Sequence, residues 1–308
     1  MNYFSAFDGI SCSSVALLPL GFKCIGVSEI DPFCCKLLEQ KYGHKNFGDF
    51  TKWREWGKIE TDLALFSPPC TAFSNLGQRR GTKDPAGQLT LETIRFICRN
   101  APRWFAVENV PQLLHADRTR LWRHLCSTLS RRGYNLAWQV LDAQYFGVPQ
   151  RRRRIFTIGH LGSSTCAAKV LFDSQTLPVF DTSSEEERQE YSRTIEEHHQ
   201  RDCTGSDHSD HHRTRYKDNP RVSGTLATQI DGGAEQVNRL VIDNGRVRYL
   251  TPLECERLQG FPDGYTQGFS DTQRYKMLGN SIAVPVMKFI GTRILAVEQE
   301  AVEWSKAG

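Results

Sequence analysis

Residues 2–29 decide the fold, and they read NYFSAFDGISCSSVALLPLGFKCIGVSE. The apolar run 2–7 predicts a short strand that breaks at the turn 8–9, and 13–20 has the spacing of a helix. A second strand is predicted over 24–28. Strand, helix and strand in this order form a βαβ unit, which is the building block of a parallel sheet.

The same alternation continues to about residue 160. Further strand candidates and two amphipathic helices follow, in chain order over 63–66, 89–99, 104–107, 121–129, 136–141 and 155–158. Strands that alternate with helices predict the α/β class, here a mostly parallel sheet with helices on both faces. We assign residues 1–160 to this sheet domain.

The character of the sequence changes after residue 160. Residues 163–200 are polar and contain the acidic run 185–187, and 198–212 holds five of the nine histidines. Strand-like pieces over 222–230 and 237–242 are separated by Asp and Gly turns. These features predict a small, mainly β and loop domain over 161–246.

Helical character returns in residues 247–308. Thr251 is a plausible N-cap, Pro252 suits the first helical position, and Glu254 completes a capping box. Residues 284–301 predict a last helix that returns to the sheet. We therefore expect 247–308 to complete the first domain.

Composition excludes several classes of protein. Lys and Arg number 39 and Asp and Glu 35, and a net charge of +4 is too balanced for a protein that binds nucleic acid by bulk charge alone. The ten cysteines include no C-x-x-C pair, and the N-terminus does not resemble a signal peptide. No apolar run reaches the roughly 18 residues of a membrane helix. We expect a soluble cytoplasmic protein with reduced cysteines and no membrane association.

Two reactive side chains follow neighbouring strand candidates. Cys70 comes after the rigid turn 67–69, and Glu108 comes after strand 104–107. Open α/β sheets build their sites at these strand ends, and a thiol beside an acid is suited to covalent catalysis. Taken alone, Cys70 is also compatible with a buried structural cysteine.

A run of four arginines precedes the last strand of the predicted sheet. In Gln150-Arg151-Arg152-Arg153-Arg154, strand alternation sends Arg152 and Arg154 to one face and Arg151 and Arg153 to the other. One pair can then enter the site, while a solvated edge or a phosphate-binding patch are the alternatives.

Gly9 and Glu29 together suggest a nucleotide-type cofactor. Gly9 lies at a strand-to-helix turn, and Glu29 follows 20 residues later at the end of the next strand, where a carboxylate can bind ribose hydroxyls. A plain tight turn is the alternative, because further fingerprint glycines are absent.

Taken in chain order, these residues resemble the DNA (cytosine-5) methyltransferase family over nearly the whole chain. The blocks that carry the resemblance are 7–10 (FDGI), Glu29, 48–50 (GDF), 68–70 (PPC), 108–110 (ENV), 150–154, 248–262 (RYLTPLECERLQGFP) and 279–282 (GNSI). The resemblance implies a Rossmann-like methyltransferase sheet with a small target-recognition domain.

The resemblance also implies a reaction, namely methyl transfer from S-adenosylmethionine to carbon 5 of cytosine in a specific duplex DNA sequence. Cys70 would attack carbon 6 of a flipped-out cytosine, and Glu108 would bind the N3 and amino edge of the base. Arg152 and Arg154 would hold the base carbonyl and the loop that carries the cysteine.

For the cofactor, the resemblance implies that Phe7 stacks on adenine beside Gly9, Glu29 binds the ribose, and Asp49 binds the adenine amino group. The remaining contacts would come from Phe50, Pro69, Leu89, Asn280 and Ser281.

For DNA, it implies contacts from Ser74 and Gln150 and from the region 161–246, where Arg213, Arg215, Lys217, Arg221 and Thr225 are candidates. Their alternative is an ordinary solvated loop. We expect a monomer that acts on double-stranded DNA, with a restriction endonuclease as a separate cognate partner.

Three other functions remain open. A tRNA cytosine-5 methyltransferase shares the same catalytic blocks, although the Cys-Phe-Thr signature of such relatives is absent. A catalytically silent DNA-binding homologue is the second, and it conflicts with the presence of every reactive residue. The third is a zinc site in 198–212, whose spacing matches no standard ligand pattern, so we expect no metal.

Overall fold

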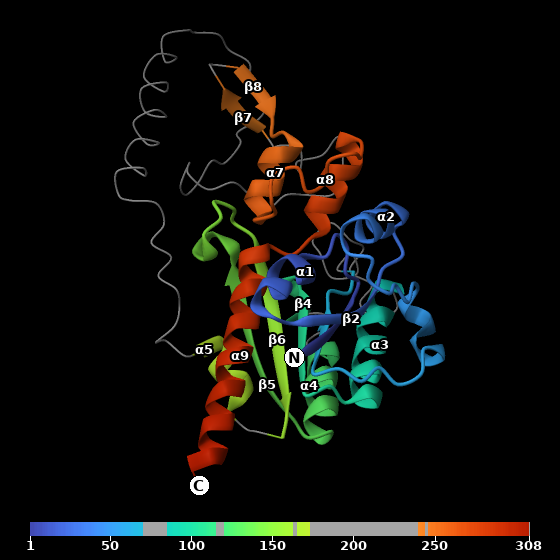
Figure 1. Cartoon of the computed structure of the whole chain (residues 1–308), viewed down its shortest axis with the longest axis vertical. Helices are drawn as coiled ribbons and strands as arrows, with labels where there is room; N and C mark the ends of the chain where they lie inside the picture. Colours follow the sequence, from blue (N-terminus) through green and yellow to red (C-terminus); the bar gives the residue numbers. More distant parts are fainter. Residues whose placement is uncertain (70–84, 115–119, 163–164, 173–239, 244–245, 308) are drawn as a thin grey trace.

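The computed structural model describes residues 1–69, 85–114, 120–162, 165–172, 240–243 and 246–307. Within them, six strands form one sheet in the order β2-β1-β3-β4-β6-β5 (Figure 1). Their bounds are β1 Asn2–Ala6, β2 Lys23–Ser28, β3 Leu63–Phe66, β4 Trp104–Asn109, β5 Tyr134–Asp142 and β6 Arg153–Leu161. The first four are parallel, as predicted, and β6 runs antiparallel to both β4 and β5. The patterns of the sequence did not predict that reversal.

Helices surround the sheet and follow it in the chain. They are α1 Cys12–Leu17, α2 Pro32–Lys41, α3 Pro85–Asn100, α4 Arg120–Arg131, α5 Cys166–Phe172, α7 Pro252–Gln259, α8 Asp271–Asn280 and α9 Val284–Ala307. Short 3-10 helices include η1 Leu18–Leu20, η2 Phe50–Glu55 and η5 Ala143–Phe146. Strands β7 Leu240–Asp243 and β8 Arg246–Tyr249 pair with each other in a separate antiparallel hairpin.

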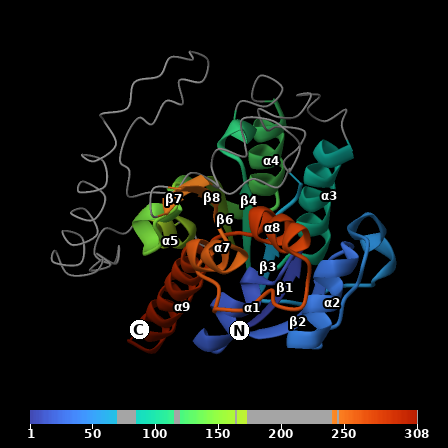
Figure 2. The ribbon, with the colours of Figure 1, turned by 90° about the horizontal axis from the view of Figure 1, so that it is seen from above.

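Both faces of the sheet are covered because the central strands are apolar at consecutive positions, which point to opposite faces. Tyr3 and Leu65 belong to a buried cluster with α1 and α9, whereas Phe4 and Phe66 face a second cluster with α3 and α4. Figure 2 shows these helix pairs on opposite sides of the sheet. The two clusters hold the strands in register, so that the strand ends have fixed positions.

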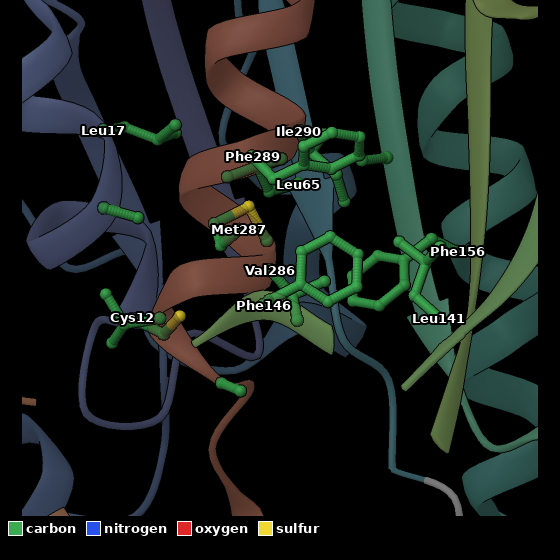
Figure 3. Packing of buried hydrophobic residues seen from close by; sticks show 14 of the residues in the cluster. Cys12, Leu17, Leu65, Leu141, Phe146, Phe156, Val286, Met287, Phe289 and Ile290 are labelled. Carbon is green, nitrogen blue, oxygen red and sulfur yellow. The ribbon is translucent and has the colours of Figure 1, made fainter. Parts of the chain in front are cut away.

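The last helix closes the core against the first. Leu17 of α1 and Ile290 of α9 are fully buried, and Figure 3 shows them in one cluster with Leu65 and Met287. Gly291 has no side chain at this contact, where an added Cβ would lie 2.3 Å from Leu17 Cδ2. The close approach of the two helices therefore depends on this glycine.

One stretch of the described chain, 271–303, is long and apolar enough to cross a membrane. Inside the protein, 61% of its most apolar window is buried, as in any helix that belongs to a core.

The start of α7 has the geometry that its sequence predicts. The Thr251 hydroxyl accepts a hydrogen bond from the Glu254 N–H, and the Glu254 carboxylate accepts one from the Thr251 N–H. Arg248 of β8 donates to both oxygens of Glu254 at 2.9 Å, which joins the hairpin to the helix.

Helix α5 packs against β5, β6 and α9, so residues 166–172 lie with the sheet even though they follow the predicted boundary at 160. The strand-like piece 222–230, the acidic run 185–187 and the histidine-rich tract 198–212 lie outside the described residues. The division into domains stays a prediction.

Candidate active site

A cleft lies at the carboxyl ends of the central strands. It is lined by Phe7 and Gly9 after β1, Glu108 at the end of β4, Asn280 at the end of α8 and Ser281 after it. A parallel sheet creates such a cleft because the loops after neighbouring strands diverge to opposite faces.

The turn after β1 is held in an unusual backbone conformation. Phe7, Gly9 and Ser11 have φ values of 58°, 57° and 58°, in the left-handed region that favours glycine. Side chains stabilise the turn, since the Ser13 hydroxyl donates to Asp8 Oδ1 at 2.6 Å. Burial raises the pKa of Asp8. The sequence analysis missed Asp8, because no motif assigns a role to the residue before the glycine.

Glu29 is connected directly to this turn. Its carboxylate accepts hydrogen bonds from the N–H groups of Gly9 at 2.7 Å, Ile30 at 2.8 Å and Asp31 at 2.7 Å. Burial raises the pKa of Glu29, and these three bonds oppose that rise because they favour the charged form. The carboxylate therefore fixes the turn to the end of β2.

Asn46 links the two acidic segments that the sequence analysis assigned to the cofactor. Its Oδ1 accepts from the N–H groups of Glu29 at 3.1 Å and Gly48 at 2.9 Å, and its Nδ2 donates to the Glu29 carbonyl at 3.0 Å. Asp49 then caps η2 by accepting from the Thr51 N–H at 2.9 Å. Sequence reasoning missed Asn46, which lies outside every recognised block.

Some predicted cofactor residues lie around the cleft rather than in its lining. The Phe50 ring packs on Phe7 with centroids 4.7 Å apart, which supports the aromatic wall from behind. Glu29, Asp49, Pro69 and Leu89 are likewise absent from the lining. Pro69 is exposed and Leu89 half-buried.

Glu108 is held at the cleft by two side chains. It is 8% exposed, Arg154 Nε lies 3.1 Å from its Oε1, and the Ser67 hydroxyl donates to its Oε2 at 2.9 Å. Asn109 Nδ2 donates to the Pro68 carbonyl at 3.3 Å, which ties the end of β4 to the turn after β3. The sequence analysis treated Ser67 only as part of that turn, and its bond to Glu108 was missed.

The four arginines alternate as predicted. Arg152 is 3% exposed and Arg154 is half-buried, whereas Arg151 and Arg153 are exposed. Arg152 donates to the carbonyls of Gly279 at 3.1 Å and Ser281 at 2.7 Å, so it holds the end of α8 and the residue that follows it at the cleft. Arg152 and Arg154 thus have separate contacts although they share a face.

Gln150 is a correction to the sequence analysis. Its side chain is fully buried, and its Nε2 donates to the Leu258 carbonyl of α7 at 3.0 Å. The alternation that buries Arg152 also turns Gln150 inward, so the expected direct contact with DNA is wrong for this conformation.

Several candidates lie outside the described residues. They are Cys70, Ser74, Arg213, Arg215, Lys217, Arg221, Thr225 and the histidine-rich tract. Among the residues that the structure does describe, no three His, Cys, Asp or Glu side chains group as metal ligands.

A family model described as C-5 cytosine-specific DNA methylase matches residues 1–296 of the chain. Type II methyltransferase M.DsaV of Dactylococcopsis salina is 30% identical, with 96% of this chain and 86% of the relative covered. Type II methyltransferase M.HpaII of Haemophilus parainfluenzae is also 30% identical, with 96% and 89% covered. The match therefore includes the sheet, the cleft and the C-terminal helices.

Solved structures have the same fold. Entamoeba histolytica methyltransferase EhMeth aligns with a TM-score of 0.66 at 15% identity and covers 96% of this chain and 98% of its own. A putative DNA modification methyltransferase encoded within an Escherichia coli prophage aligns with a TM-score of 0.65 at 18% identity, over 97% and 99%. With the fold, the cleft and the matched length in agreement, the chain belongs to the C-5 cytosine-specific DNA methylase family.

Proposed function

We propose that this cytosine-5 DNA methyltransferase acts on a specific duplex DNA sequence, flips the target cytosine out of the helix and bonds it transiently to Cys70. The observation that carries this proposal is the position of Glu108, which Arg154 and Ser67 fix at the cleft. Ser67 also begins the turn that leads into Cys70. The acid and the nucleophile therefore come from neighbouring strands of one sheet.

The cleft suits S-adenosylmethionine, the cofactor that membership of this family implies. Phe7 supplies an aromatic surface, and Asp8 lines the cleft with one carboxylate oxygen, Oδ2, buried without a hydrogen-bond partner in the described structure. Glu29 and Asp49 add negative charge nearby, which favours a ligand that carries positive groups. When bound, the cofactor supplies an electrophilic methyl group on a sulfonium.

We assign the cofactor contacts by region. Phe7 and Gly9 would face the adenine with Phe50 behind them, Glu29 would accept from the ribose hydroxyls and Asp49 from the adenine amino group. Asn280 and Ser281 would face the rest of the cofactor, with Pro69 and Leu89 flanking the segment that carries Cys70.

The chain's own groups activate the base. Carbon 5 of cytosine is a weak nucleophile, and addition of the Cys70 thiolate to carbon 6 makes it an enamine carbon. Glu108 would hold N3 and the amino group of the base while carbon 5 takes the methyl group. The bond between that methyl group and the sulfonium sulfur breaks, and its electron pair stays on sulfur. Loss of the carbon 5 proton to a base then breaks the bond to sulfur and releases Cys70.

Positive charge around the cleft supports this addition. A thiol with a pKa of about 8.5 is only slightly ionised at neutral pH, and cationic neighbours favour the thiolate. Arg154 lies against Glu108 and brings such a positive charge to the site. Arg152 holds residues 279–281 and so keeps the opposite wall in place.

DNA recognition is proposed for the second region. Residues 161–246, without the α5 helix, would form a target-recognition domain in which Arg213, Arg215, Lys217, Arg221 and Thr225 contact DNA, with Ser74 contacting it from the segment that carries Cys70. We further propose a cytoplasmic monomer with a restriction endonuclease as a separate partner, because the relatives are Type II methyltransferases.

A methylation assay tests the proposal. The enzyme is incubated with cofactor and a library of duplex DNA, and bisulfite sequencing should reveal one methylated cytosine context, which Cys70→Ser abolishes. With 5-fluorocytosine at that site, the carbon 5 substituent cannot leave as a proton, so a covalent complex should accumulate with the native enzyme and not with Cys70→Ala. Methylation of tRNA without methylation of DNA would overturn the proposal.

A further inference from the structure

The loop between β5 and β6 presents a positively charged surface next to Glu108. Exposed and buried residues alternate over 145–153, with the even-numbered residues buried. The exposed ones are Tyr145, Gly147, Pro149, Arg151 and Arg153. Tyr145 is 73% exposed, which is unusual for a large aromatic side chain. We call Tyr145, Arg151 and Arg153 the basic rim.

The basic rim lies at the catalytic edge of the sheet. Arg153 is the first residue of β6, and Ile155, two residues later, pairs with Asn109 at the end of β4. Arg154 lies between them in the chain and contacts Glu108. Alternation turns Arg151 and Arg153 to the other face, which α3 and α4 cover and where Ile155 is buried. Figure 1 shows the β5–β6 connection at the end of the sheet nearest to α7.

The backbone of this loop is held firmly. The Ala143 N–H donates to the Arg152 carbonyl at 3.1 Å, and the Arg152 N–H donates to Asp142 Oδ1 at 3.0 Å. The buried side chains of Gln150 and Arg152 then anchor it to α7 and to the end of α8. Because the base is fixed, the exposed side chains can bind a ligand without the cost of ordering the loop.

The charge of Arg153 is not neutralised locally. Its guanidinium forms no ion pair with any residue in the described ranges, whereas Arg154 beside it is paired with Glu108. Arg151 and Arg153 are two residues apart in an extended chain, so their Cα atoms are about 6.6 Å apart. A DNA strand presents a phosphate about every 3.4 Å along the helix axis, and two neighbouring phosphates therefore lie within reach of both guanidinium groups.

We propose that the basic rim binds the phosphate backbone of the DNA strand that flanks the flipped cytosine, with Arg151 and Arg153 on phosphates and the Tyr145 ring on a sugar or base. The inference rests on the proposed DNA substrate. It replaces the expected contact of Gln150 by contacts of its exposed neighbours. Phosphate contacts carry no sequence information, so the basic rim contributes affinity and orientation to every duplex.

Salt dependence of DNA binding tests the arginines. Each phosphate contact contributes about 0.9 to the slope of log affinity against log salt, so Arg151→Ala/Arg153→Ala should reduce that slope by about 1.8. The single variants Arg151→Gln and Arg153→Gln should each reduce it by about half as much. Tyr145→Ala should weaken binding several-fold at all salt concentrations and leave the slope unchanged.

A matched control removes the same charge elsewhere. Arg131 and Arg132 are exposed just before β5, at the end of that strand away from the basic rim. Arg131→Ala/Arg132→Ala should therefore leave the slope unchanged. Cofactor affinity by calorimetry and kcat at saturating DNA should match the native enzyme in all of these variants.

The outcomes separate this inference from the proposed function. If the native enzyme methylates duplex DNA but the double variant keeps the native slope, the basic rim is not a phosphate site. An equal loss of slope in the Arg131 and Arg132 control would also overturn it, because net charge alone would then explain the effect. Absence of DNA methylation by the native enzyme would overturn the function itself.

Discussion

At the scale of single residues, Glu108 of β4 depends on donors from the two strands that flank β4 in the sheet. Ser67 at the end of β3 and Arg154 near the start of β6 each contact one oxygen of the carboxylate. Each carboxylate oxygen can accept more than one hydrogen bond, so a cytosine can bind Glu108 while both contacts remain. We therefore expect Ser67 to orient Glu108 in the DNA complex as well.

Ser67→Ala should slow the reaction more than it weakens DNA binding. A hydrogen bond to a charged group contributes about 1.5–3 kcal/mol, so loss of the orientation that Ser67 gives to Glu108 should lower kcat by roughly tenfold or more. Single-turnover rates and DNA affinity, measured side by side, check this split. Ser67→Thr keeps the hydroxyl and should restore most of the rate, and equal losses in kcat and affinity would contradict the assignment.

Residues with a reactive or charged group could be assigned from the sequence, whereas the polar residues that position them through hydrogen bonds could not. Glu108 follows a strand candidate, so its position at the site edge could be predicted from topology. Arg154 precedes a strand candidate and reaches the same edge because β6 is antiparallel to β4, which the sequence did not predict. Ser67, Asp8 and Asn46 act through hydrogen bonds of common polar side chains, which have no periodic or spacing signal. Gln150 was misassigned because a motif position does not tell which face a side chain occupies.

At the scale of elements, the junction of β8 and α7 depends on one carboxylate. The hydrogen bonds from Arg248 lower the pKa of Glu254 to about 2, although burial opposes that shift. The Arg248 and Glu254 side chains are 38% and 32% exposed, so solvent screening reduces the stability that the pair provides. The same carboxylate caps α7, which makes the junction sensitive to acid.

Acid should weaken this junction within a defined pH range. A carboxyl whose folded pKa lies below its ordinary 4.5 stabilises the protein above that pH, and the contribution is lost as pH falls from about 4.5 towards 2. Thermal unfolding of the native protein and of Glu254→Gln between pH 6 and 3 measures the effect. The stability difference between them should shrink on acidification, and a constant difference would contradict the role of the charge.

Strong patterns located most elements. The strand predicted over 63–66 has the observed bounds, and the capping box at Thr251 lies where its sequence indicates. Helices α2 and α8 were not predicted. Each is 10 residues long and buries only three residues, so its apolar pattern is short. The antiparallel direction of β6 escaped prediction because strand patterns carry no direction.

At the scale of the whole molecule, the two ends of the chain complete one structure. Phe7 and Gly9 line the cleft on one side, and Asn280 and Ser281 line it on the other. Packing of α9 against α1 keeps these walls together. The sheet domain that the sequence places in residues 1–160 is therefore incomplete without residues 247–308.

Gly291→Ala should destabilise the whole fold, because the added Cβ would overlap Leu17. Overpacking of a core costs about 1–3 kcal/mol, and urea unfolding should show a loss of free energy of unfolding in that range. Thr292→Ala, on the exposed side of the same helix, is the control and should change stability by less than about 0.5 kcal/mol. Native stability of Gly291→Ala would show that the two helices can separate without cost.

The construction of the cleft from both ends of the chain also sets when activity can begin. A ribosome that adds about 5–20 residues per second needs roughly 15–55 s to go from the first wall of the cleft to the last. Over that time the nascent chain has only one wall of the cleft, and the apolar side of α1 lacks its partner helix. A message truncated before α8 therefore yields a chain without the second wall, so we expect DNA methylation only from chains that extend beyond α8.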